Sequence, residues 1–182
     1  MKRLKDLLIY AIPILFIACA TSRNSSIIYS DNYDKQTDQT SVLIFPSQEF
    51  KIPGKWTNTG YNNVSGQLFF LGPDSTRIAI ALMHWNKYEF SYNNPNVSKD
   101  NFVKRFYEWD ANYLKERTNG NIKILIDNEE KNYLVWNLES EKHGNDYFLF
   151  GLKGETAYNI NIKSEKWEVE KQIRFLELLF NQ

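Results

Sequence analysis

The pattern of apolar and polar positions in the middle of the chain predicts a β-hairpin. Residues 67–71 form a short apolar run, and Gly72-Pro73-Asp74 after it is typical of a tight turn. If the next segment, Arg77 to Trp85, is extended, its two faces are Ile78, Ile80 and Leu82 on one side and Ala79, Ala81, Met83 and Trp85 on the other. Because both faces are apolar, we expect a central strand that is covered on both sides.

The apolar spacing changes to a helical period over Asp100 to Arg117. Ser98 or Asp100 can cap the start of this helix, and Gly120 can close its end. The apolar residues that fall on one stripe are Phe102, Val103, Phe106, Trp109, Tyr113 and Leu114. We expect this stripe to pack against a sheet.

After Gly120 the period of the apolar residues returns to two, which is typical of strands. Short polar turns divide the segment, at Asn128-Glu129, His143-Gly144-Asn145 and Lys153-Gly154-Glu155. The alternating apolar residues between the turns are Ile122, Ile124 and Ile126, then Leu134, Trp136 and Leu138, then Phe148, Phe150 and Leu152, then Tyr158, Ile160 and Ile162. This pattern predicts a four-strand antiparallel meander.

The chain ends in a second predicted helix, from Ser164 to Phe180. Ser164 can cap it, and Glu165 and Glu168 suit the positive amino-terminal end of the helix dipole. Its core stripe is Val169, Ile173, Leu176 and Phe180. The order of strands, helix, four strands and helix predicts an α+β domain, with an antiparallel sheet of about six strands covered by helices in an α/β/α sandwich.

Composition divides the chain into three parts. Residues 20–41 are rich in Ser, Thr, Asn, Asp and Gln, and such a segment buries too little apolar surface to offset the entropy lost on ordering. We therefore expect a signal segment at residues 1–18, a flexible tether at 19–41 and one domain at 42–182. The alternative for the tether is a first strand around Ile27.

Charge and composition exclude several classes of protein. The 22 basic residues balance the 22 acidic ones, so the chain lacks the basic excess typical of nucleic-acid-binding proteins. One cysteine and two histidines leave no zinc cluster or disulfide, and we expect no metal and no cofactor.

The amino terminus resembles the signal peptide of bacterial lipoproteins. Lys2, Arg3 and Lys5 precede an uncharged, mainly apolar run from Leu7 to Ala18, which is too short to span a bilayer as a helix. The run ends in Phe16-Ile17-Ala18-Cys19, where the small residue and the cysteine fit a lipobox and Phe16 stands where leucine is commoner.

This resemblance implies cleavage between Ala18 and Cys19 and attachment of lipid to the Cys19 thiol, which would anchor the protein to a membrane. Two or more acyl chains give stable anchoring, since each buried methylene contributes about 0.8 kcal/mol. The alternative is a buried cysteine at the end of an uncleaved anchor. Cleavage would leave 19 basic and 21 acidic residues, a net charge of −2.

The domain resembles the PsbP family of extrinsic photosystem proteins and their bacterial relatives. The resemblance rests on Phe50-Lys51-Ile52-Pro53-Gly54-Lys55-Trp56, on the order of the predicted elements and on a terminal amphipathic helix with Trp167. It implies an antiparallel sheet sandwiched by helices, and an accessory role in which the protein binds other proteins without catalysis.

The sequence holds no Gly-rich phosphate loop, nucleophile elbow, H-E-x-x-H or EF-hand motif. His84 is one candidate for a general base, although a histidine at the edge of a core face is the simpler interpretation. The acidic pair Glu129-Glu130 falls in a predicted hairpin turn, and Glu139 and Glu141 flank the predicted turn at His143. Surface acids are common in hairpins. We therefore expect that the protein is not an enzyme.

The more unusual feature of the composition is its aromatic content, which is 15% of the chain. We select Trp85, Tyr88 and Tyr92, which lead into a turn at Asn93-Asn94-Pro95, as a candidate surface for a protein or glycan. The alternative is that Trp85 and Phe90 pack inward. The loop from Asn58 to Ser65 is a second candidate surface.

The sequence therefore predicts an envelope lipoprotein that binds another envelope protein as an accessory or assembly factor. The alternatives are a module that binds a small molecule or glycan, and a hydrolase centred on His84. The residues after Cys19 include Arg23 and no acid before Asp31. Since early acidic residues mark surface export in some lipoprotein systems, we expect an outer-membrane location facing the periplasm.

Overall fold

The computed structural model describes residues 31–44, 48–142 and 144–182. The elements in these residues are the strands β1 (Asp31–Asp34), β2 (Gln39–Ile44), β3 (Gln48–Pro53), β4 (Thr57–Asn62), β5 (Gln67–Leu71), β6 (Arg77–His84), β7 (Asn121–Asn128), β8 (Tyr133–Ser140), β9 (Gly144–Lys153) and β10 (Thr156–Lys163), the 3-10 turn η1 (Trp85–Lys87), and the helices α1 (Phe102–Thr118) and α2 (Val169–Phe180). Cys19 and Ala18 lie outside the described residues.

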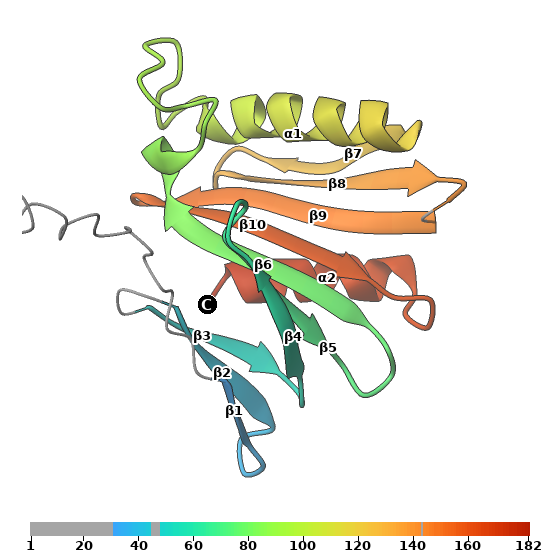
Figure 1. Cartoon of the computed structure of the whole chain (residues 1–182). Coiled ribbons are helices and arrows are strands. Elements are labelled where there is room, and N and C mark those ends of the chain that lie inside the picture. Colours follow the sequence, from blue (N-terminus) through green and yellow to red (C-terminus); the bar gives the residue numbers. More distant parts are fainter. Residues whose placement is uncertain (1–30, 45–47, 143) are drawn as a thin grey trace, which may run out of the picture.

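The strands form two antiparallel sheets (Figure 1). The main sheet has seven strands in the order β4-β5-β6-β10-β9-β8-β7, and the smaller sheet has the order β1-β2-β3. Helix α1 packs on β7, β8 and β9 on one face of the main sheet, and α2 packs on β9 and β10 on the other face. The result is three layers, helix, sheet and helix, with the smaller sheet beside them.

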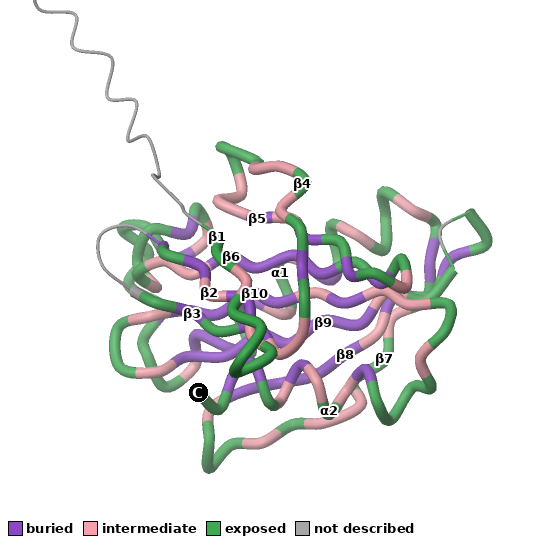
Figure 2. Tube along the Cα trace, turned by 90° about the horizontal axis from the view of Figure 1, so that it is seen from below, coloured by how far each residue is buried: buried purple, intermediate pink, exposed green. Residues whose placement is uncertain are grey.

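Each face of the main sheet carries its own hydrophobic core. Buried residues follow the interior strands such as β9 and β10, as the purple stretches of the trace in Figure 2 show. Alternate residues of β9 divide between the cores, because Phe150 packs under α1 and Leu149 packs under α2. The core on the α2 side also takes the buried residues Val42 and Ile52 of the smaller sheet. The core on the α1 side is rich in aromatic rings, and the Phe106 and Phe150 rings stack there with centroids 4.1 Å apart.

The predicted fold class is confirmed. The hairpin is β5 and β6, and β6 lies inside the sheet between β5 and β10 with Ile78 and Ala79 both buried on its opposite faces. The four-strand meander is β7 to β10, and its strands pair in chain order.

Both helices begin later than we expected, and the predicted caps do not act as caps. Helix α1 has Asn101 at its N-cap without a side-chain hydrogen bond. It ends at Thr118, and Asn119, rather than Gly120, closes it in the left-handed conformation. Ser164 lies before α2 as part of a turn, because its Oγ accepts hydrogen bonds from the N–H groups of Lys166 and Trp167.

Regular structure is present before residue 42, inside the segment where we expected a flexible tether. Residues 31–41 contain β1 and the start of β2, in which the Thr40 side chain is buried. Its hydroxyl donates to the Gly54 carbonyl and accepts from the Trp56 N–H. Composition did not reveal these strands because backbone pairing and one buried hydroxyl, rather than apolar side chains, hold them. Residues 19–30 of the predicted tether, Ile27 included, lie outside the described residues.

The segment from Asn58 to Ser65, which we expected to be a loop, belongs mostly to β4 and to the turn that joins β4 to β5. Most of its side chains are polar, as is usual on an edge strand, and β4 is an edge strand of the main sheet. A register shift between Asn58 and Gly60 interrupts its pairing with β5.

Candidate functional site

The candidate site is built by the segment 85–101, which joins β6 to α1, and by the flank of α1 that this segment faces. The segment begins with η1 and then sends Tyr88 into the core, where only 7% of its surface is exposed. The Ser91 hydroxyl lies close to the carbonyls of Trp85 and Tyr88 and holds this bend. The segment is therefore a packed part of the fold that places side chains beside α1.

Aromatic stacking joins the segment to α1. The Phe90 ring lies nearly parallel to those of Phe102, Phe106 and Trp109, with centroids 5.4, 5.6 and 5.3 Å away. The Tyr88 ring contacts Phe106 at 4.5 Å. Phe90 therefore continues the core outwards to the surface, where Trp109 ends the row of rings with 42% of its surface exposed.

Two aromatic residues on α1 point out of the core, contrary to our expectation for its apolar stripe. Trp109 is 42% exposed and Tyr113, one turn further on, is 54% exposed. Arg117, a turn beyond Tyr113, donates a hydrogen bond to the Tyr113 hydroxyl and lies over its ring at 5.9 Å. The outer flank of α1 therefore bears two large aromatic side chains that remain substantially exposed, although Phe90 stacks against Trp109.

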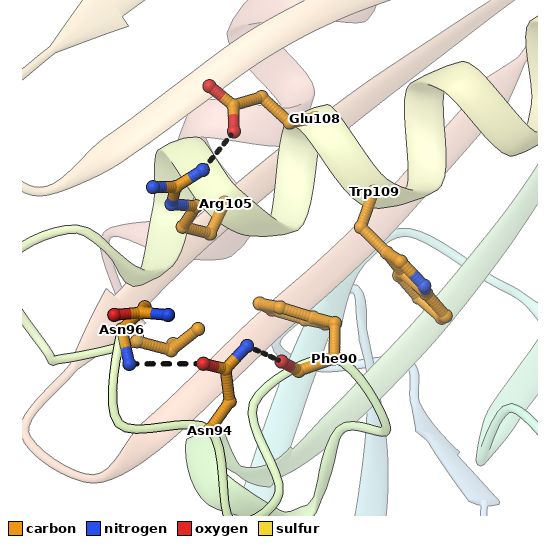
Figure 3. A pocket seen from close by; sticks show the side chains of 7 residues that line it. Phe90, Asn94, Asn96, Arg105, Glu108 and Trp109 are labelled. Atoms are coloured by element: carbon orange, nitrogen blue, oxygen red, sulfur yellow. Dashed lines mark hydrogen bonds and ion pairs between the residues drawn. The ribbon is translucent and has the colours of Figure 1, made fainter.

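A groove of about 530 Å³ lies between the amino-terminal half of α1 and the segment 85–101 (Figure 3). The residues that line it are Phe90, Asn94, Asn96, Val97, Arg105, Glu108 and Trp109. Phe90 and Trp109 form its aromatic end, whereas the asparagines on one side and the Arg105–Glu108 pair on the other make the rest polar. The groove therefore combines a flat apolar surface with hydrogen-bonding groups.

Some polar groups of the groove are hydrogen-bonded within the protein, and others are left to bind a ligand. The Asn94 side chain donates to the Phe90 carbonyl at 3.1 Å and accepts from the Asn96 N–H at 3.0 Å, so it fixes the turn. One nitrogen of Arg105, Nη1, donates to Oε2 of Glu108 at 3.1 Å. Among the described residues, the Asn96 carboxamide has no hydrogen-bond partner.

Glu155, in the turn between β9 and β10, ties the segment 85–101 to the sheet. Its carboxylate accepts a hydrogen bond from Nε1 of Trp85 at 2.8 Å, pairs with Lys99, and lies 3.2 Å from Nε2 of His84. Nδ1 of His84 accepts from the Asn86 N–H at 3.4 Å. Both ring nitrogens of His84 therefore face partners, and His84 is not one of the residues that line the groove.

Among the acidic residues near the site, Asp110 has the pKa that departs furthest from its usual value. Burial raises its pKa to about 6, because α1 and the elements beneath it withdraw the carboxylate from water. Burial also raises the pKa of Tyr88, and the charge of Asp110 adds to the effect. The Tyr88 hydroxyl has no hydrogen-bond partner among the described residues.

The structure separates the residues that we selected from the sequence. Tyr92 is 66% exposed, Trp85 is half-buried with its indole N–H on Glu155, and Tyr88 lies in the core. Tyr88 is therefore wrong as part of an exposed surface, because the bend after η1 turns it inward. Trp109, Arg105 and Asn96 were not selected. The sequence could have indicated Trp109, because it lies four residues from both Arg105 and Tyr113. In a helix this spacing places all three side chains on one flank.

The described residues offer little else that indicates a function. They include no group of three or more His, Cys, Asp or Glu side chains arranged to hold a metal ion. Neither helix in the described part of the chain is long and apolar enough to cross a membrane.

Comparison with protein-family models and with curated protein sequences finds no match for this chain. Among solved structures, it is similar to cyanobacterial PsbP (CyanoP) from Synechocystis sp. PCC 6803. The identity is 9% and the TM-score 0.42, over 85% of this chain and 91% of the cyanobacterial one. PsbP is also the family that the sequence resembles. With so low an identity and TM-score, the similarity says nothing about function.

Proposed function

We propose that this protein is a non-catalytic lipoprotein of the bacterial envelope, anchored through lipid on Cys19, that binds another envelope protein as an accessory or assembly factor. The observation that carries the binding role is the pair Trp109 and Tyr113 on the outer flank of α1. Large aromatic residues contribute most to binding at many protein interfaces, since they bury much apolar surface and lose little conformational entropy.

The partners of His84 support a role without catalysis. A general base needs a free lone pair directed at the substrate, whereas Nδ1 of His84 accepts a backbone hydrogen bond and Nε2 faces Glu155. His84 fits better as part of the contact that fixes the segment 85–101 beside α1.

The anchor and the binding surface are tested separately. In cells that produce the full chain, Cys19→Ala should abolish incorporation of labelled palmitate and release the protein from the membrane fraction. Ser22→Ala, which removes a nearby side chain and keeps the cysteine, should leave both unchanged. Labelling that persists in Cys19→Ala cells would contradict the anchor.

For the binding surface, a partner recovered from detergent extracts by cross-linking is purified and titrated with the wild type. Tyr113→Ala should weaken this binding by about tenfold, equivalent to ~1.4 kcal/mol. Leu178→Ala on α2, which removes a side chain that is 52% exposed on the other face of the sheet, is the matched control. Equal binding by wild type and Tyr113→Ala would overturn the assignment of this flank as the partner surface.

A further inference from the structure

We propose that the groove between α1 and the segment 85–101 is a binding site for a neutral oligosaccharide, which stacks one sugar ring on Trp109 and hydrogen-bonds to Asn96, Arg105 and Glu108. This inference goes beyond the proposed protein-binding function, with which it shares Trp109, and it uses the amino-terminal half of α1, one turn before Tyr113. It does not depend on the protein partner.

The aromatic end of the groove supplies the flat apolar surface that a sugar ring needs. Trp109 is 42% exposed, and its inner neighbour Phe90 stacks against it at 5.3 Å with 28° between the ring planes. Phe90 is in turn stacked on the buried ring of Phe106, which fixes the orientation of the row. The C–H face of a pyranose is flat and apolar, so it can cover the exposed indole while its hydroxyls point towards the polar walls.

The polar walls offer donors and acceptors in the combination that hydroxyl groups require. Each sugar hydroxyl both donates and accepts, and the Asn96 carboxamide has both kinds of atom with no partner among the described residues. The Arg105–Glu108 pair uses one guanidinium nitrogen and one carboxylate oxygen for its own contact. The remaining N–H groups of Arg105 and the second oxygen of Glu108 leave a donor and an acceptor side by side, as neighbouring hydroxyls need.

Charge and size narrow the ligand class. Because Arg105 and Glu108 are paired, the groove presents no unbalanced cation for a phosphate or carboxylate, which favours a neutral ligand. Its volume of about 530 Å³ falls within the ~300–1,000 Å³ of small-molecule sites. The groove is open to solvent, so a chain of sugar rings can extend beyond it.

The site is also held in place before a ligand arrives. Asn101 accepts from the Ser98 N–H and donates to the Asn96 carbonyl at 3.0 Å, and Lys99 pairs with Glu155 at the other side of the segment. A site that is already ordered loses little entropy when it binds, which a weakly binding ligand such as a neutral sugar requires.

The test is isothermal titration of the purified full chain with maltohexaose, cellohexaose and hexa-N-acetylchitohexaose. We expect saturable binding of at least one of them. Trp109→Ala should weaken that binding at least tenfold, Trp109→Phe should recover most of it, and Asn96→Ala should weaken it about threefold. Tyr113→Ala, outside the groove on the same helix, should leave sugar binding unchanged.

Absence of binding to all three sugars at 10 mM would overturn the proposal, as would equal binding by wild type and Trp109→Ala when both have the same thermal unfolding curve. If Trp109→Ala abolishes capture of the protein partner while no sugar binds, the groove is a peptide site and the saccharide proposal fails. If Tyr113→Ala loses the protein partner but keeps sugar binding, and Trp109→Ala does the reverse, the protein surface and the sugar site are separate and both proposals stand. A failure of either one is therefore recognised on its own.

Discussion

The rings of Phe90 and Trp109 are stacked with their centroids 5.3 Å apart, and this pair joins the segment 85–101 to the outer flank of α1. The segment has no regular structure of its own beyond η1, so its position depends on such contacts. Phe90 is the central ring, since it stacks on Phe102 and Phe106 as well as on Trp109.

Phe90→Ala should destabilise the fold and loosen the segment. Phe90 is only half-buried, so we expect a loss of about 2 kcal/mol in the free energy of unfolding, less than the ~3–5 kcal/mol typical of a fully buried phenylalanine. Urea denaturation measures the loss. Tyr92→Ala, in the same segment but 66% exposed, should change the stability by less than ~0.5 kcal/mol. Equal stabilities of the two variants would show that Phe90 does not hold the segment.

Asp110→Asn should stabilise the protein at neutral pH. The pKa of Asp110 is about 6 in the folded protein and near 3.8 when exposed, so the folded state binds the proton more tightly than the unfolded state. The contribution of Asp110 to the free energy of unfolding is therefore fully present below pH ~4, where the carboxyl is protonated in both states. It is lost as the pH rises through ~6, where the folded protein must bury the charge. Two pKa units correspond to roughly 3 kcal/mol, which sets the upper limit of the gain at pH 7.5.

Unfolding of the wild type and of Asp110→Asn is compared at several values between pH 4 and pH 8. The advantage of the variant should grow between pH 4 and pH 7 and then stay constant. Asp100→Asn, which removes the charge of an exposed carboxylate just before α1, is the control for net charge. A variant that is less stable than the wild type at pH 7.5 would mean that the Asp110 carboxylate makes a favourable contact there.

Glu155→Gln should free the segment 85–101 without unfolding the domain. The substitution removes the charge that pairs with Lys99 and faces His84, both of which are near the surface. Exposed ion pairs contribute only about 0–1 kcal/mol, so the global stability should change little. Hydrogen–deuterium exchange of peptides from residues 85–101 should become several-fold faster, while peptides from β8 and β9 keep their rates. Glu165→Gln, in the exposed turn before α2, is the matched control.

Gly151→Ala should destabilise the packing of α2 on the sheet. A Cβ atom at Gly151 would overlap the ring of Phe180, which lies buried in the last turn of α2. Overpacking of this kind costs about 1–3 kcal/mol, because neither the interior strand β9 nor the helix can move freely. Thermal unfolding measures the effect.

The smaller side chain in Phe180→Leu should relieve this overlap. We expect the double variant Gly151→Ala/Phe180→Leu to be at least ~1 kcal/mol more stable than the sum of the two single changes predicts. If the two changes are additive, the Gly151–Phe180 contact does not limit this site.

The sequence by itself determined the elements in which side-chain periodicity is strong. Strand β6, with apolar residues on both faces, and the alternating strands β7 to β10 were predictable because period two follows directly from extended backbone geometry. The two helices were predictable for the same reason at period 3.6. Their ends were not, because Asn119 and Ser164 make contacts that depend on where the neighbouring turns lie.

Tertiary structure alone decided the smaller sheet and the exposed flank of α1. Strand β1 is polar, and it forms because its backbone pairs with β2, an interaction that residue types do not encode. Helical periodicity placed Trp109 and Tyr113 on the same stripe as Phe106. It does not say how much of that stripe the sheet beneath α1 covers. Since α1 packs on β7 to β9, the flank that bears Trp109 and Tyr113 extends past its support and faces outward.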